Sequence, residues 1–186
     1  MGKRKDKSAL TYVYDSREQR AYDMARPDPK LFDDGGWYED ALDAGDITAE
    51  LDGERLSIRI ERKQHGDFIG CCKHDRGCEA NQLGNDPKCS ARCRFERELA
   101  RLSSFSHAHI IIEAPMAQLE AGYVHSMMNG TAVVNSIACW STRYPTLHFW
   151  TVANRTAGQK YARVLIHEAA KHSQGGSGDG DGDREH

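Results

Sequence analysis

The stretch that decides the fold is GDITAELDGERLSIRIERKQHGD, residues 45–67. Two runs of alternating apolar and polar residues flank Asp52-Gly53, a dipeptide typical of tight β-hairpin turns. In the second run the apolar and polar side chains point to opposite sides of a strand, Leu56, Ile58 and Ile60 against Ser57, Arg59, Glu61 and Lys63. The pattern predicts a hairpin with one apolar and one polar face.

The polar face of this hairpin gathers groups that could carry chemistry. A turn centred near Gly53 places Asp46 opposite about residue 60, beside Glu61 and Lys63. Carboxylate oxygens suit a hard cation such as Mg²⁺ or Mn²⁺, which polarises phosphoryl oxygens and activates water. A lysine beside them can orient that water or stabilise the developing charge. The pattern is what phosphodiester cleavage requires; the alternative is a solvated face of an amphipathic hairpin.

The wider motif resembles the nuclease signature of the XPF family of structure-specific endonucleases. Gly45-Asp46 is followed after fourteen residues by Glu61-Arg62-Lys63, and after three more by Asp67. Three further segments resemble the family's first strand, its Arg/Glu-rich helix and its central strand: YDSRE (14–18), RFERELARL (94–102) and HIIIE (109–113). The resemblance covers about residues 10–170. It implies an α/β fold of the restriction-endonuclease-like PD-(D/E)XK superfamily, a central mixed β-sheet flanked by helices.

The resemblance also implies the roles of individual residues. The catalytic set would be Asp46, Glu61, Arg62, Lys63 and Asp67. Asp46, Glu61 and Asp67 would hold the metal, and Lys63 would act on the nucleophile or the transition state. Arg62 would support the carboxylates or touch phosphate, with a plain salt bridge as the alternative.

A second group of residues would surround this set. Asp15, Glu18 and Glu113 would form a supporting acidic rim, although each has a purely structural alternative, as a loop stabiliser or a strand-end cap. Arg17, Arg94, Arg97 and Arg101 would contact DNA, the last three because they repeat at helical spacing on one face. The alternative is that the helix arginines are ordinary exposed residues that bind no DNA.

Five of the six cysteines fall within residues 71–93. The pairs Cys72/Cys78 and Cys89/Cys93 could form a structural Cys₄ zinc site that staples an irregular insertion. Their spacing is wider than in tight C-x-x-C pairs, and free thiols or disulfides are the alternatives.

The formal net charge of −3 at first argues against a nucleic-acid partner. That charge equals the charge of residues 173–186, a Gly/Asp-rich segment expected to be a disordered acidic tail, and residues 57–172 are net basic. We therefore expect a basic extension over 1–9, a nuclease domain over 10–172 with the Cys-rich insertion, and the tail. No apolar run approaches a membrane span and the N-terminus lacks a secretory signal, so we expect an intracellular, cytoplasmic protein, nucleoid-associated if bacterial or phage-encoded.

The resulting prediction is a Mg²⁺- or Mn²⁺-dependent DNA endonuclease acting on branched, flap or fork structures in repair, recombination or phage DNA processing. The family's helix-hairpin-helix motifs do not follow residue 172, so a homodimer or a partner protein would supply specificity. Two alternatives stay open: a non-catalytic, zinc-stapled DNA-binding or scaffold module on the same fold, and a nuclease that targets RNA.

Beyond the hairpin, hydrophobic periodicity predicts the remaining elements. These are strands at 10–14, 107–113 and 146–150, a short helix or turn at 37–44, and helices at 67–78, around 94–102, around 133–140 and at 156–171.

Overall fold

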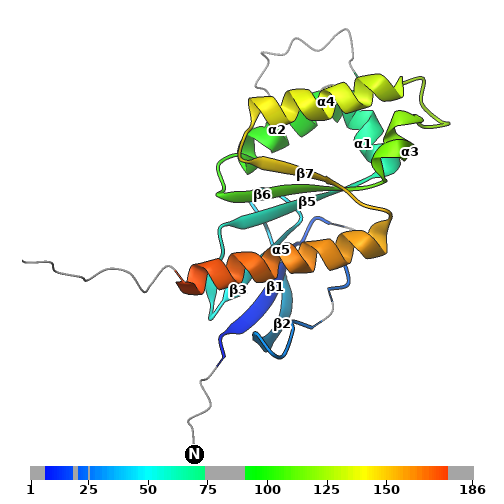
Figure 1. Cartoon of the computed structure of the whole chain (residues 1–186). Helices are drawn as coiled ribbons and strands as arrows, with labels where there is room; N and C mark the ends of the chain where they lie inside the picture. Colours follow the sequence, from blue (N-terminus) through cyan, green and yellow to red (C-terminus); the bar gives the residue numbers. More distant parts are fainter. Residues whose placement is uncertain (1–6, 19–20, 25, 74–90, 176–186) are drawn as a thin grey trace, which may run out of the picture.

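The computed structural model describes residues 7–18, 21–24, 26–73 and 91–175. These residues form a mixed sheet with helices on both faces (Figure 1). Its strands are β1 (Ala9–Asp15), β2 (Asp33–Asp40), β3 (Ile47–Leu51), β4 (Glu54–Arg55), β5 (Ile58–Gln64), β6 (His107–Glu113) and β7 (Leu147–Thr151). The helices are α1 (His65–Cys72), α2 (Ala91–Leu102), α3 (Met116–Glu120), α4 (Gly130–Arg143) and α5 (Arg155–Gly175).

The sheet order is β2-β1-β3-β5-β6-β7, with β4 added to the end of β3. Strand β3 runs antiparallel to its neighbours β1 and β5, whereas β2 is parallel to β1, and β5, β6 and β7 are parallel to one another. The predicted α/β fold with a central mixed sheet flanked by helices is therefore confirmed. Strand β5 lies between the antiparallel β3 and the parallel β6, and its carboxyl end at Gln64 leads directly into α1.

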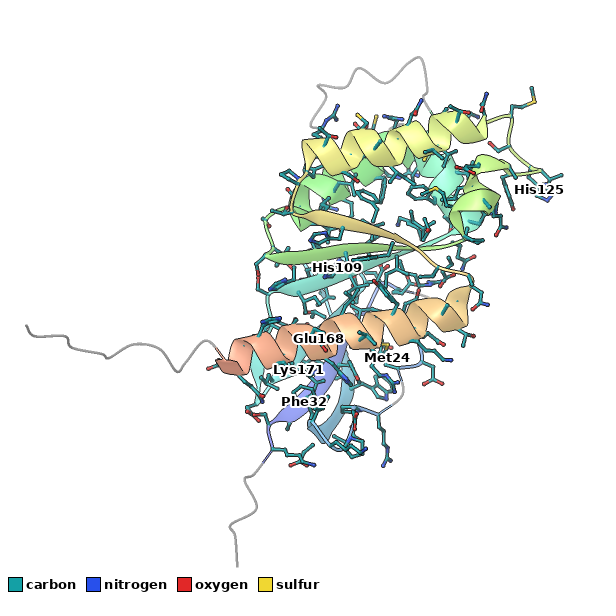
Figure 2. All side chains as sticks on the ribbon, in the orientation of Figure 1. Met24, Phe32, His109, His125, Glu168 and Lys171 are labelled. Carbon is teal, nitrogen blue, oxygen red and sulfur yellow. The ribbon has the colours of Figure 1, made fainter. Side chains whose placement is uncertain are left out.

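Two apolar layers hold the helices to the sheet. On one face α5 covers Ile58, Ile60 and Ile111, and Figure 2 shows Met24 and Phe32 below the same helix. On the other face α1, α2 and α4 cover Ile110 and Ile112. Alternate residues of β6 thus enter opposite layers, which explains why HAHIIIE reads as a continuously buried strand.

One predicted element is wrong. Residues 37–44 are not a short helix or turn, because β2 (Asp33–Asp40) pairs in parallel with β1 and contains Trp37 and Tyr38. Nearly all of β2 is exposed, so its sequence DDGGWYED lacks the apolar alternation by which a half-buried strand is recognised. The rings of Trp37 and Tyr14 pack edge to face, with centroids 5.9 Å apart.

The other elements lie close to their predicted positions, with two shifts of boundary. The first helix occupies His65–Cys72 rather than 67–78, and α5 continues to Gly175, three residues into the predicted tail. The rest of that tail, most of the basic extension and residues 74–90 of the Cys-rich insertion predicted at about 71–93 lie outside the described residues. No described helix has the length and apolar character needed to cross a membrane.

Candidate active site

The hairpin of β3 and β5 brings Asp46 and Glu61 together. The Asp46 amide donates to the Ile60 carbonyl at 2.8 Å, and the strand register pairs Ile47 with Ile60. Asp46 therefore lies within one residue of its predicted position opposite about residue 60. One carboxylate oxygen of Asp46, Oδ2, accepts from the Arg62 backbone amide at 2.7 Å. Both bonds involve backbone groups of β5, and together they fix Asp46 and its side chain beside that strand.

Glycine is required immediately before this aspartate. Gly45 has a φ of +73°, and a Cβ at this position would lie 3.2 Å from the Ile60 carbonyl oxygen. A side chain would be both conformationally strained and crowded there. The backbone amide of Gly45 donates to Oε1 of Glu98 on α2 at 2.9 Å.

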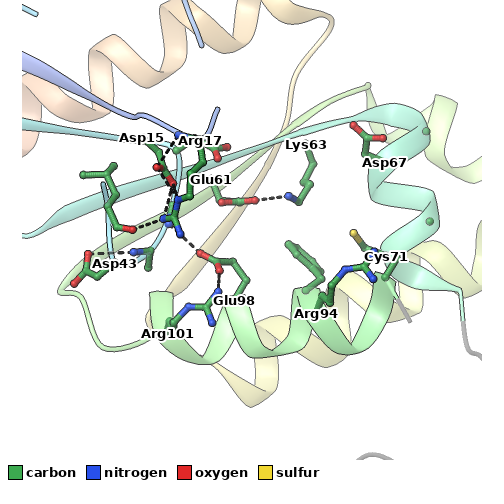
Figure 3. Close-up of a pocket in the computed structure, with 18 residues that line it drawn as sticks. Asp15, Arg17, Asp43, Glu61, Lys63, Asp67, Cys71, Arg94, Glu98 and Arg101 are labelled. Carbon is green, nitrogen blue, oxygen red and sulfur yellow. Dashed lines mark hydrogen bonds and ion pairs between the residues drawn. The ribbon is translucent and has the colours of Figure 1, made fainter. Parts of the chain in front are cut away.

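The side chains of Asp46, Glu61 and Lys63 line a cavity of about 780 Å³ between the sheet and helices α1 and α2 (Figure 3). The Nζ atom of Lys63 donates to Oε1 of Glu61. Predicted residues around the same cavity are Asp15, Arg17, Asp67, Arg94 and Arg101. Most of the predicted set, drawn from four separate segments of the chain, therefore meets in one place.

The electrostatics of this cavity are unbalanced toward negative charge. Burial, and then the neighbouring Glu61 carboxylate, raise the pKa of Asp46 well above its ordinary range. Burial also raises the pKa of Glu61, although Lys63 opposes this. For Lys63, burial disfavours the ammonium, but Glu61 and then Asp46 outweigh it and raise its pKa. Lys63 is therefore a stable cation at neutral pH. The positive charge of Lys63 does not fully compensate for the two neighbouring carboxylates, Asp46 and Glu61.

Asp46 and Glu61 fit a magnesium or manganese ion. Both offer oxygen atoms, and proteins commonly hold Mg²⁺ by one or two carboxylates, with water and substrate oxygens completing the shell. Within the described residues, no three or more Asp, Glu, His or Cys side chains are grouped closely enough to bind a metal. Asp67 lines the cavity from α1, and Figure 3 shows Lys63 between Glu61 and Asp67. The role of Asp67 as a third ligand stays a prediction.

Arg62 points away from this group. Its Nε donates to Glu113 at 2.7 Å and its Nη1 to Glu18 at 3.3 Å, and its side chain is only 5% exposed. Arg62 also lies over the ring of Tyr22, 5.5 Å from the centroid. The salt-bridge alternative for Arg62 therefore describes its contacts in this structure, and Glu18 and Glu113 are its partners.

The predicted DNA-binding arginines divide between two surroundings. Arg17 pairs with Asp15 through two nitrogens, Nε to Oδ1 at 2.9 Å and Nη2 to Oδ2 at 2.7 Å, and its side chain stays 67% exposed. Arg94 and Arg101 reach the cavity from α2, whereas Arg97 is not among its lining residues. Three of the four arginines thus surround the carboxylates, where they could meet phosphates.

Two of the four predicted zinc ligands, Cys72 and Cys93, lie within the described residues. Cys72 is a buried free thiol, and Cys93 is disulfide-bonded, which is the redox alternative to metal ligation by the same sulfur. Cys78 and Cys89 lie outside the described residues, so the Cys₄ zinc site stays a prediction. Cys71, which had no predicted role, lines the cavity, and burial raises the pKa of its thiol to about 11.

Glu98 is a cavity residue that the sequence interpretation missed. It lies within RFERELARL, where the sequence interpretation gave a role only to the arginines. A weak signal existed, because Glu98 precedes the buried Leu99 and lies one turn from both Arg94 and Arg101.

Comparison with known proteins shows the fold. No protein-family model matches the sequence, and no curated protein sequence matches it. The structure is similar to XPF from Aeropyrum pernix, with a TM-score of 0.55 and 16% sequence identity over 95% of this chain and 67% of that chain. For XPF from Aeropyrum pernix in complex with DNA, the TM-score is 0.53 and the identity 16%, over 89% of this chain and 66% of that chain. The chain thus spans about two thirds of each XPF chain, and the XPF-like fold is confirmed.

Proposed function

We propose that this chain is an XPF-type endonuclease that hydrolyses DNA phosphodiester bonds with the help of Mg²⁺ or Mn²⁺. The observation that carries the proposal is the convergence of Asp46, Glu61 and Lys63 in one cavity rimmed by arginines. Their order in the chain matches the GD–ERK–D signature, and the fold matches XPF from Aeropyrum pernix.

Asp46 and Glu61 would hold the divalent cation. When bound, such an ion supplies Lewis-acid stabilisation of a phosphoryl oxygen and lowers the pKa of a water molecule. The net reaction adds water across one P–O ester bond and leaves a phosphate monoester on one strand end and a hydroxyl on the other.

Lys63 contributes by charge rather than by taking up a proton. Because Glu61 and Asp46 raise its pKa, the ammonium persists at neutral pH and has no lone pair to act as a base. It can donate hydrogen bonds to a phosphoryl oxygen and stabilise the negative charge that develops in the transition state. The same ammonium keeps Glu61 oriented in the absence of substrate.

The arginines would position the DNA backbone. Arg17, held by Asp15, reaches the cavity from the β1 side, whereas Arg94 and Arg101 reach it from α2. Guanidinium groups pair well with phosphate oxygens, so a strand lying between them would present a phosphate to the carboxylates. Branched, flap or fork DNA is our proposed substrate class, with a second copy of the chain or another protein adding specificity, in the cytoplasm or at a nucleoid.

A cleavage assay tests the proposal. Duplex, flap, fork and single-stranded DNA, and single-stranded RNA, would be incubated with the protein in Mg²⁺ and in EDTA. We expect cleavage of DNA only with Mg²⁺, and none by Asp46→Asn. Asp43→Asn is the matched control, since Asp43 lines the same cavity but is 69% exposed and pairs with Arg59. Cleavage in EDTA, or equal rates for Asp46→Asn and the wild type, would contradict the proposal.

A further inference from the structure

Glu98 connects helix α2 to the turn that carries Asp46. Its Oε1 accepts from the Gly45 amide at 2.9 Å, and its Oε2 pairs with Arg101. The Glu98 side chain is 18% exposed and is part of the cavity wall, so it is not an ordinary solvated helix residue. The contact joins positions 53 residues apart in the chain.

The Gly45–Asp46 segment is held from two sides. The Gly45 amide points to Glu98 on α2, whereas the next amide, that of Asp46, donates to the Ile60 carbonyl on β5. The positive φ of Gly45 allows two consecutive amides to reach these opposite partners. Removing the Glu98 carboxylate would release the restraint on the Gly45 amide, immediately before Asp46.

We propose that Glu98 is a positioning residue for the metal-binding carboxylate of Asp46, a role that rests on the proposed function. Glu98 acts through the Gly45 amide and does not itself hold the cation. Its negative charge is a cost, because it lies near enough to Glu61 to raise the pKa of that group. Arg101, on the same helix face, compensates for this charge and holds the second oxygen of Glu98.

Three substitutions separate positioning from charge. Glu98→Gln keeps an oxygen acceptor at the same reach and removes the charge, whereas Glu98→Asp keeps the charge and withdraws the acceptor by one methylene. Glu98→Ala removes both. Since losing an outer hydrogen-bond partner typically weakens metal binding 10–100-fold, we expect the Kd for Mn²⁺ to rise about tenfold in Glu98→Ala and Glu98→Asp. In Glu98→Gln it should stay within about threefold of the wild type.

The measurement is an EPR titration with Mn²⁺ on the full chain without DNA, followed by cleavage rates over a range of Mn²⁺ concentrations. Glu168→Ala is the matched control, since Glu168 also forms an i,i+3 ion pair, with Lys171 on α5. It should bind Mn²⁺ as the wild type does. A thermal melt of each variant shows that the chain is folded, and if Glu98→Ala is not, the comparison of Glu98→Gln with Glu98→Asp decides.

The outcomes distinguish this role from the proposed function. If the chain binds Mn²⁺ in the expected order of variants but cleaves no DNA, the nuclease proposal fails and the positioning role stands. Wild-type binding in Glu98→Asp with weakened binding in Glu98→Gln would assign the effect to charge and overturn the positioning role. Wild-type affinity for Mn²⁺ in all three Glu98 variants would overturn the positioning role as well. So would wild-type affinity in Asp46→Ala.

Discussion

The two sides of strand β5 carry two charged clusters that differ in how their charges are balanced. The cleft cluster (Asp46, Glu61 and Lys63) faces the cavity beneath α2. In the arginine cluster (Arg62, Glu18 and Glu113), the two glutamates pair with the Arg62 guanidinium, and the Arg62 side chain is 5% exposed. Three consecutive residues, Glu61-Arg62-Lys63, supply both clusters because successive side chains of a strand point to opposite faces.

The difference shows which cluster is prepared for a ligand. In the arginine cluster the carboxylates converge on a cation, and Glu113 and Glu18 raise the pKa of Arg62 although burial opposes this. In the cleft cluster the buried Glu61 carboxylate and the partly buried Asp46 carboxylate lie together, and the pKa of each is raised. A buried cluster with unfavourable self-energy is costly to the fold and is typical of functional sites. The cleft cluster therefore lacks positive charge that a divalent cation would provide.

The largest effect is expected from Asp46→Asn. Asparagine can still accept the Arg62 amide hydrogen bond, so the fold should remain. Loss of a metal ligand removes several kcal/mol of transition-state stabilisation, so cleavage should fall about 10³-fold or more. Single-turnover cleavage in Mg²⁺ measures this, and activity within tenfold of the wild type would place the metal elsewhere.

The same variant should stabilise the metal-free protein at alkaline pH. The folded pKa of Asp46 is raised above its unfolded value, so the folded state binds the proton more tightly, and its stability falls as the pH rises through that interval. Asp46→Asn removes this loss. Thermal melts in EDTA should show a higher Tm for the variant at pH 8 and a smaller difference at pH 4.

Arg62→Leu should be the most destabilising change in the arginine cluster. It leaves Glu113 and Glu18 without their shared buried cation, at a cost of about 3–5 kcal/mol in the free energy of unfolding. Urea denaturation measures the loss. Arg26→Leu is the control, because the Arg26–Asp34 pair is 89% exposed on the arginine side and should change stability by less than about 1 kcal/mol. Equal stability of the two variants would show that the arginine cluster is not structural.

Lys63→Met should impair chemistry more than metal binding. Removing one preorganised donor to a developing charge typically costs about 10²–10³-fold in rate, whereas the two carboxylates would remain. We expect that loss in single-turnover cleavage, with a Kd for Mn²⁺ within a few-fold of the wild type. Retention of full activity would remove Lys63 from the catalytic set.

Arg94→Ala should have the smallest effect. A side chain that contacts one backbone phosphate contributes mainly salt-dependent affinity, so DNA binding should weaken a few-fold and the slope of log Kd against log salt should fall by about one. Arg143→Ala on α4 is the control, because Arg143 is similarly exposed but is not among the residues that line the cavity. An unchanged slope for Arg94→Ala would place DNA elsewhere.

The local parts of the site could be predicted from the sequence. Asp52-Gly53 and the period-two pattern of β5 are sufficient to place Asp46 beside Glu61 and Lys63. The same alternation places Arg62 on the opposite face of β5. The family resemblance, in contrast, implies one catalytic set that includes Arg62.

The parts that depend on tertiary contacts could not be predicted. Strand β2 exists because its backbone pairs with β1, and its exposed residues carry no periodic signal. The role of Glu98 depends on a contact with Gly45 that no local pattern encodes. Likewise, the partners of Arg62, Glu113 at the end of β6 and Glu18 after β1, become apparent only once these segments are assembled around β5.

The most direct test of the central claim is anomalous diffraction from a crystal of the chain soaked in Mn²⁺. The account predicts a manganese peak in the cavity within coordinating distance of carboxylate oxygens of both Asp46 and Glu61, absent from Asp46→Asn crystals treated in the same way. A cavity without manganese at a concentration that supports cleavage, or a peak that persists in Asp46→Asn, would contradict it.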